Sequence, residues 1–249
     1  MLPTCPHYGV CGGCSLAHLP YQEQLDFKTN KVASALKSFE VDLSPIIPAP
    51  SLYHYRNKVE FTFFPLENQI VGLGFHQKGQ FSRFVNLEKC LISTENNGLL
   101  LDLIRDWAHS EGFSAYDKRK RSGLLKYLIV RDSFSTGQKM IILVTNGGFA
   151  EQFMGLERIL SQHFSLAGVI WSNQPEQADT VLLLHSEVLA GQPAFMDSIG
   201  SKKFMIPLNS FFQVNTQAAT ILYDLIRSHI QHKDHVLDLY CGAGTISCY

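Results

Sequence analysis

The chain has 249 residues, of which 45% are hydrophobic, so it is long enough to bury one or two globular cores. Its 21 basic and 22 acidic residues nearly cancel, which excludes a polybasic or histone-like protein but still allows a local basic surface. No apolar run approaches the ~18 residues that span a bilayer. The sequence also does not begin with the basic stretch and following apolar stretch that are typical of a signal peptide. We therefore expect no membrane partner and a cytoplasmic location.

The cysteines are clustered in a way that indicates metal binding. Cys5, Cys11 and Cys14 lie in a loop rich in glycine and proline, and Cys90 is a distant fourth. In a reducing compartment, such a cluster is more typical of a metal site than of disulfides. Four thiolates suit either a [4Fe–4S] cluster or structural zinc, and His7 could replace one thiolate in a Cys3His zinc site. The residues alone leave these alternatives open.

The hydrophobic pattern then predicts alternating helices and short strands. Helices are predicted for residues 21–39, 93–112, 150–164 and 216–229, the last with Asn215 as its N-cap. Strands are predicted for residues 59–63, 71–75, 79–85, 124–131, 140–145, 168–172, 180–185 and 190–206, with a hairpin near Gly200 in the last of these, and a short buried strand for Val236–Tyr240.

These elements predict an α+β fold with a mostly antiparallel sheet, followed by a segment of different character. In that last segment, Asp238 at the end of an apolar strand precedes a turn that contains Gly242 and Gly244. Class I S-adenosylmethionine methyltransferases begin in this way, whereas the dinucleotide-binding and P-loop patterns do not match. An ordinary strand-to-helix turn is the alternative.

Five segments follow one another along the chain: Cys5–Cys14, Tyr55-Arg56-Asn57-Lys58, Cys90, Phe211-Phe212-Gln213-Val214-Asn215 and Asp238–Thr245. Their order resembles that in the bacterial RNA (uracil-5-)-methyltransferases, most closely the iron–sulfur-containing branch that methylates 23S ribosomal RNA. The resemblance extends over essentially the whole chain.

The resemblance implies two cofactors and an RNA partner, with 23S ribosomal RNA as the expected substrate. A [4Fe–4S] cluster would be held by Cys5, Cys11, Cys14 and Cys90. S-adenosylmethionine would be bound by Gln213, Tyr240, Gly242, Gly244 and Thr245. Three domains follow: an iron–sulfur loop and helix (1–40), a central β-rich RNA-binding domain (41–205), and the beginning of a Rossmann-like methyltransferase domain (206–249).

In this family a cysteine thiolate adds to uracil C6, so that C5 can attack the sulfonium methyl group, and a carboxylate then removes the C5 proton. The target base must leave its stack for this to occur. The resemblance puts both the cysteine and the glutamate beyond residue 249. We therefore expect a C-terminally truncated chain that is inactive alone, with residues 206–249 poorly ordered or packed on the first domain. The alternatives are a non-catalytic RNA-binding iron–sulfur module and a zinc-stabilised binding domain.

Tyr55, Arg56 and Lys58 combine a stacking ring with two cations, which favours contact with RNA. The basic run 118–121 could add to such a surface, although a solvated loop explains it equally well. The phenylalanines at positions 61, 63 and 64 are expected in the core rather than on a base-stacking surface.

Overall fold

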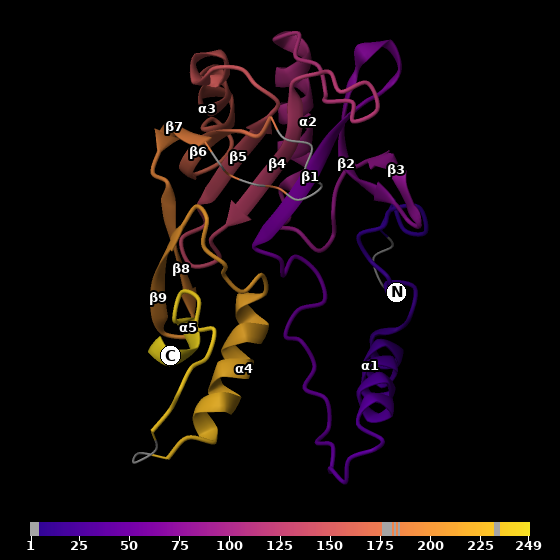
Figure 1. The fold of residues 1–249 in the computed structure, drawn as a ribbon, viewed down its shortest axis with the longest axis vertical. Helices are drawn as coiled ribbons and strands as arrows, with labels where there is room; N and C mark the ends of the chain where they lie inside the picture. The colour runs from indigo at the N-terminus through magenta and orange to yellow at the C-terminus, as the bar shows by residue number, and fades with distance from the viewer. Residues whose placement is uncertain (1–4, 176–180, 182, 184, 232–234) are drawn as a thin grey trace.

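The computed structural model describes residues 5–175, 181, 183, 185–231 and 235–249 (Figure 1). Within these residues, no helix is both long and apolar enough to cross a membrane. The helices are α1 (Tyr21–Ala35), α2 (Asn97–Ser110), α3 (Gly155–Leu160), α4 (Thr216–Ser228) and α5 (Thr245–Cys248), with short 3-10 turns η1 (Glu67–Gln69) and η2 (Ala150–Phe153). The strands are β1 (Lys58–Pro65), β2 (Val71–Gln77), β3 (Gln80–Asn86), β4 (Leu125–Asp132), β5 (Lys139–Thr145), β6 (Leu166–Asn173), β7 (His185–Gly191), β8 (Ala194–Ile199) and β9 (Lys202–Pro207).

A seven-stranded sheet in the order β3-β2-β1-β4-β5-β6-β7 forms the centre of this part of the chain. Every neighbouring pair is antiparallel except β5 and β6, which are parallel because η2 and α3 form the crossover between them. Strands β8 and β9 form a separate antiparallel hairpin that turns at Gly200. The predicted mostly antiparallel sheet and the hairpin are confirmed.

The sheet has a core on each face. On one face, α2 and α3 cover the strands, and this helical-face core contains Phe61, Phe63 and Ile141. On the other face, β8, β9 and α4 cover β4–β6, and this hairpin-face core contains Ile142. Strands β4 and β5 are buried at every position, which explains the continuous apolar runs 127–130 and 140–144 within them.

The predicted burial of the three phenylalanines is confirmed, although they do not share one face. Phe61 and Phe63 point into the helical-face core. Phe64, one residue later in the same strand, lies on the opposite face and stacks on Phe84 at 5.0 Å between ring centroids. The outer strands of the sheet therefore carry an aromatic surface outside both cores.

The structure differs from the predictions in the helix lengths and at one strand. The helix predicted for residues 150–164 is divided into η2 and α3, and α2 is shorter than predicted. Val236–Tyr240 forms no strand, so the predicted strand of a Rossmann-like domain is absent there. Its apolar and aromatic side chains are exposed, and no described strand lies beside it to pair its main-chain groups. The strand predicted for residues 180–185 lies partly outside the described residues.

The segment after β9 packs on the hairpin face. Asn215 is the N-cap of α4, as predicted, because its Oδ1 accepts a hydrogen bond from the N–H of Ala218 at 3.0 Å. Tyr223 lies on the buried face of α4, and its ring meets that of Tyr249 edge-on at 5.5 Å between ring centroids. The chain thus folds back on α4 after Val236–Tyr240, so this end of the described chain packs on the rest.

Candidate functional site

The four predicted metal-binding cysteines line a single cavity of about 350 Å³. Cys5, Cys11 and Cys14 come from the N-terminal loop, and Cys90 comes from the loop between β3 and α2. All four are free thiols. The fold therefore brings together ligands that are far apart in the sequence.

Main-chain hydrogen bonds fasten the N-terminal loop to the β2–β3 hairpin. The N–H of Gly12 donates to the carbonyl of His76 at 2.9 Å, and the N–H of Lys78 donates to the carbonyl of Val10 at 2.7 Å. A Cβ atom at position 12 would lie 2.9 Å from the His76 carbonyl oxygen, so glycine is required for this close approach. The cysteine positions therefore depend on this loop's fit against the hairpin.

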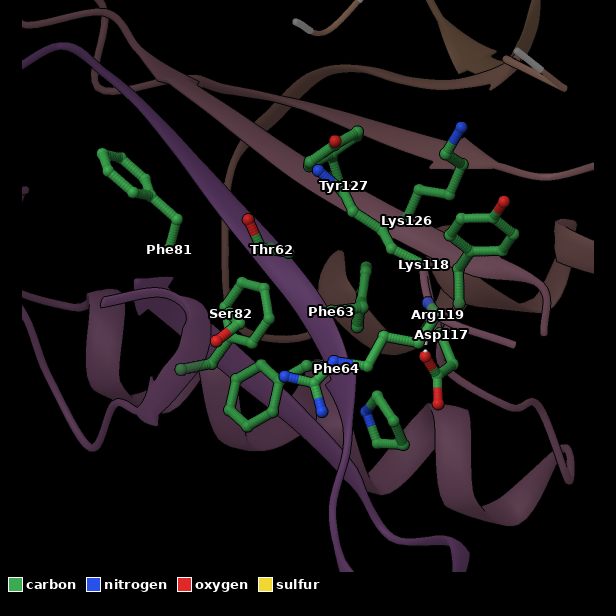
Figure 2. A pocket seen from close by; sticks show the side chains of 13 residues that line it. Thr62, Phe63, Phe64, Phe81, Ser82, Asp117, Lys118, Arg119, Lys126 and Tyr127 are labelled. Atoms are coloured by element: carbon green, nitrogen blue, oxygen red, sulfur yellow. Dashed lines mark hydrogen bonds between the residues drawn. The ribbon is translucent and has the colours of Figure 1, made fainter. Parts of the chain in front are cut away.

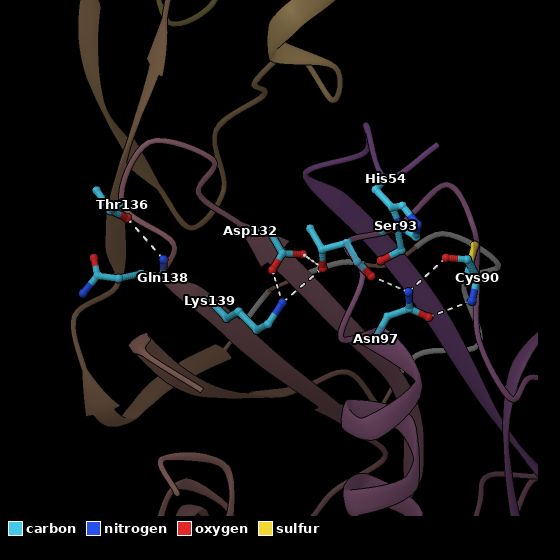
Figure 3. A network of polar contacts seen from close by, with 9 residues as sticks. His54, Cys90, Ser93, Asn97, Asp132, Thr136, Gln138 and Lys139 are labelled. Atoms are coloured by element: carbon cyan, nitrogen blue, oxygen red, sulfur yellow. Dashed lines mark hydrogen bonds and ion pairs between the residues drawn. The ribbon is translucent and has the colours of Figure 1, made fainter. Parts of the chain in front are cut away.

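The loop that carries Cys90 is held by a buried amide side chain (Figure 3). Asn97 Oδ1 accepts from the N–H of Cys90 at 2.7 Å, and Asn97 Nδ2 donates to the carbonyl of Cys90 at 2.9 Å and to that of Thr94. His54 Nδ1 lies 2.6 Å from the carbonyl oxygen of Ser93. No local sequence signal marks Asn97, and the sequence analysis did not identify it.

The thiols lie in a setting that disfavours their charged form. Burial raises the pKa values of Cys11, Cys14 and Cys90, and neighbouring thiols raise them further. At Cys11, the N–H of Gly13 donates to Sγ at 3.3 Å and opposes this rise. Thiolates here consequently need a positively charged group among them, and converging thiols fit a thiolate-bound metal group.

The four cysteines share a cavity without forming a preformed metal site among the described residues. Among the described residues, no group of three or more Cys, His, Asp or Glu side chains is placed to hold one ion. A tetrahedral zinc needs its sulfur ligands roughly 4 Å apart, since each Zn–S bond is about 2.3 Å. The alternative ligand His7 is already engaged, because its Nε2 accepts from the N–H of Glu88 at 3.0 Å.

The predicted RNA-binding residues lie beside the cysteine cavity. Tyr55 and Arg56 line a hollow of about 390 Å³ together with Cys14. Arg56 and Lys58 line a second hollow of about 380 Å³. The charge of Lys58 is partly offset by Glu60, whose Oε1 lies 2.7 Å from Lys58 Nζ. These residues thus connect the cysteine loop with the rest of the sheet.

The second hollow also contains a buried arginine that the sequence analysis did not identify. Arg131 donates to the carbonyl of Ser210 at 2.9 Å and to that of Pro207 at 3.2 Å. Its Nε is buried without a hydrogen-bond partner among the described residues, and burial lowers its pKa. Arg131 holds the turn after β9 against β4 and adds positive charge beside Arg56 and Lys58.

The residues predicted to bind S-adenosylmethionine are not gathered at one point. The main chain of Gln213 and Val214 is held by Asn57: its Nδ2 donates to the Gln213 carbonyl, and the Val214 carbonyl accepts from its N–H, both at 2.9 Å. Tyr240, another predicted residue, lies in the C-terminal turn with its side chain fully exposed. In the described part of the chain, no hydrogen bond joins Gln213 to that turn.

The C-terminal turn adopts a left-handed backbone conformation at both of its glycines. Gly242 and Gly244 have φ angles of 55° and 66°, and Tyr240 also has a positive φ of 60°. Thr245 Oγ1 lies 2.8 Å from the hydroxyl of Tyr223. The turn is thus tied to α4 through Thr245 and not to the segment that contains Gln213.

No family model matches the sequence. A protein of Chlorobaculum tepidum is 34% identical over 99% of this chain, and one of Caldanaerobacter subterraneus subsp. tengcongensis is 36% identical over 97% of it. Both are named uncharacterised RNA methyltransferases. The chain is a homologue of proteins named RNA methyltransferases. It spans 56% of the length of each of these two relatives.

A solved structure with the same fold supports the observed architecture. The tRNA (uracil-54, C5)-methyltransferase of Pyrococcus abyssi, solved in complex with S-adenosyl-L-homocysteine, matches with a TM-score of 0.77. The match covers 95% of this chain and 55% of that protein, at 24% sequence identity. The mixed α/β fold is therefore shared with a methyltransferase structure.

Proposed function

We propose that the protein takes part in transferring a methyl group from S-adenosylmethionine to C5 of uracil in RNA, with 23S ribosomal RNA as the substrate. Relatives named RNA methyltransferases align with nearly all of the chain. The observation that carries the proposal is the adjacency of the cysteine cavity, Tyr55–Lys58 and the segment that contains Gln213. This adjacency joins all but the last of the motif segments that resemble the uracil-5 methyltransferases.

S-adenosylmethionine would supply an electrophilic methyl group at its sulfonium sulfur. The support for this cofactor is the resemblance of the sequence motifs and the methyltransferase names of the relatives. The residues that we propose for binding it are Gln213, Tyr240, Gly242, Gly244 and Thr245. We assign residues 206–249 to cofactor binding, residues 41–205 to RNA binding and residues 1–40 to the metal group.

The metal group in this proposal is a [4Fe–4S] cluster on Cys5, Cys11, Cys14 and Cys90. The support for it is the resemblance of the sequence motifs, together with the four cysteines that line one cavity. Four cysteine thiolates are the usual ligands of a [4Fe–4S] cluster. It would join the N-terminal loop to the loop that carries Cys90, and thereby fix the neighbouring Tyr55 and Arg56.

Deleting the gene tests the proposed reaction in the cell. The 5-methyluridine content of 23S ribosomal RNA, measured by mass spectrometry of nucleosides, should fall and should recover when the gene is restored. A fall confined to transfer RNA would contradict the proposed substrate but not the reaction. Unchanged 5-methyluridine in both RNA classes would contradict the reaction and leave the non-catalytic RNA-binding iron–sulfur module as the better description.

Anaerobic purification tests the metal group. The protein should be brown, absorb near ~400 nm and contain iron and acid-labile sulfide. Cys90→Ser should lose most of the iron, whereas Cys248→Ser, at an exposed cysteine in α5, should retain it. A colourless preparation with one zinc per chain would overturn the cluster assignment.

Salt-dependent RNA binding tests the basic segment. In Arg56→Ala/Lys58→Ala, the negative slope of log K against log salt should become shallower by about 1.4, because each lost phosphate contact on a single strand removes about 0.7 from its magnitude. Lys202→Ala/Lys203→Ala, at exposed positions in β9, is the matched control. An unchanged slope in the first variant would exclude Arg56 and Lys58 from RNA binding.

A further inference from the structure

A cavity of about 410 Å³ lies on the face of β1–β3 opposite the helical-face core (Figure 2). We propose that it binds an unpaired base of single-stranded RNA, stacked on aromatic rings, with a neighbouring phosphate held by Lys118 and Arg119. This inference rests on the proposed function, because it assumes an RNA substrate. It assigns a site that is separate from the cysteine cavity and the Tyr55–Lys58 segment. Its lining comes from residues 62–65, 81, 82, 84, 116–119, 126 and 127.

The first observation is a row of aromatic rings across the three outer strands. Phe64 stacks on Phe84 with a centroid distance of 5.0 Å and an interplanar angle of 12°. The ring centroids of Phe84 and His76 are 4.4 Å apart, and those of His76 and Phe81, which meet edge-on, are 6.2 Å apart. Exposure increases along this row, from 5% at Phe64 to 88% at Phe81. The buried end supports the row, and the exposed end offers a ring to a ligand.

A glycine allows the buried ring to lie close to the sheet. Gly72 on β2 is paired with Phe64 on β1, and a Cβ atom at position 72 would lie 2.4 Å from the Phe64 ring. The ring therefore occupies the space that a side chain would need. Because Phe64 lies over β2, it reaches Phe84 on β3 and completes the row.

The second observation is a loop that carries cations beside these rings. Asp117 Oδ1 accepts hydrogen bonds from the N–H of Arg119 at 2.8 Å and from that of Lys120 at 3.2 Å. The main chains of Asp117 and Ser122 also pair. The loop is thus closed on itself, and Lys118 and Arg119 line the same cavity as Phe64 and Phe84.

The third observation is a buried polar atom at the cavity. Tyr127 lines the cavity, and its hydroxyl is buried with no hydrogen-bond partner among the described residues. A buried hydroxyl without a partner is unfavourable, and a hydroxyl group can both donate and accept a hydrogen bond. We do not assign Lys126 to ligand binding, because its Nζ already donates to the carbonyl of Gln174 at 2.7 Å.

Rings and cations together favour RNA over an apolar peptide. An unpaired nucleotide offers a flat base and a phosphate next to each other, and this pairing matches the two kinds of side chain in the cavity. In a duplex, the bases are stacked on one another and their faces are not available. The site should therefore select single-stranded RNA.

The test compares the affinity of variants for a labelled single-stranded oligouridine by fluorescence anisotropy. Phe81→Ala should weaken binding at least about fivefold, the lower limit for one stacked base. Its matched control is Phe149→Ala, since Phe149 is 73% exposed but lies in the loop after β5. Arg119→Ala should reduce the salt slope by about 0.7, whereas Arg158→Ala on α3 should not change it.

A second ligand separates stacking from charge. Inorganic polyphosphate carries phosphates without bases, so Phe81→Ala should leave its binding unchanged. If Phe81→Ala weakens the binding of polyphosphate and of oligouridine equally, the stacking site is overturned. If it weakens the binding of neither ligand, the site is also overturned, and a protein partner becomes the better occupant. If RNA binding then still depends on Arg56 and Lys58, the proposed function stands without this site. A wild-type protein that binds no RNA would contradict the proposed function itself.

Discussion

At the scale of single residues, the geometry of the cysteine cavity depends on side chains that are not ligands. Asn97 is buried at the start of α2 and satisfies both main-chain groups of Cys90. His7 fastens the N-terminal loop to the N–H of Glu88, two residues before that cysteine. The thiols therefore converge because the side chains of Asn97 and His7 fix the backbone on either side of the cavity.

Asn97→Ala should remove these restraints and leave the buried N–H and carbonyl of Cys90 without partners. Each unsatisfied buried group costs about 1–3 kcal/mol, so the free energy of unfolding should fall by at least about 2 kcal/mol. Urea unfolding followed by circular dichroism measures this change. Asn96→Ala is the control, because Asn96 is exposed and its side chain makes no capping hydrogen bond. Equal stability of the two variants would show that the Asn97 hydrogen bonds do not hold the loop.

At the scale of elements, a buried ion pair fastens the β4–β5 hairpin to the loop before α2 (Figure 3). Lys139 pairs with Asp132, and Thr94 Oγ1 lies 3.1 Å from Asp132 Oδ2 and 3.1 Å from Lys139 Nζ. Burial raises the pKa of Asp132, and the charge and hydrogen bond of Lys139 oppose the rise. The free-energy cost of removing the two charges from water is therefore only partly offset by the attraction between them.

Asp132→Asn should destabilise the protein by about 3–5 kcal/mol, because it leaves the Lys139 ammonium buried without a counter-charge. Adding Lys139→Met to this variant should restore part of the loss, since a neutral side chain needs no counter-charge in the core. A double-mutant cycle from urea unfolding curves measures the coupling between the two positions. If the double variant is less stable than Asp132→Asn alone, the ion pair is not the reason for the loss.

At the scale of the whole molecule, one sheet serves two cores. Ile141 and Ile142 are consecutive, fully buried residues of β5 that point into the helical-face and hairpin-face cores, respectively. Both tryptophans, Trp107 and Trp171, belong to the helical-face core. Because β4–β6 form part of both cores, neither core can be lost without exposing the same strands.

Ile142→Ala should therefore lower the midpoint of unfolding seen by tryptophan fluorescence, although its side chain lies on the face without tryptophan. Each of Ile141→Ala and Ile142→Ala should cost about 2–5 kcal/mol. For both variants, fluorescence and far-ultraviolet circular dichroism should report coincident transitions. A fluorescence midpoint that is unchanged in Ile142→Ala would show that the two faces unfold separately.

The sequence by itself determined the local elements that have a strong periodic or capping signal. The alternation of β1, the continuous apolar runs of β4 and β5, and the N-cap at Asn215 all predicted what the structure contains. These features depend on neighbours within a few residues along the chain. The clustering of Cys5, Cys11 and Cys14 was likewise visible without a fold.

Tertiary structure decided which distant groups meet. The restraint of Cys90 by Asn97 and the docking of Gln213 on Asn57 depend on contacts between separate elements, and no short pattern encodes them. The strand predicted for Val236–Tyr240 has the right composition, but it has no described neighbour to pair its main-chain groups. A strand is defined by its partners, so composition alone could not determine whether this one forms.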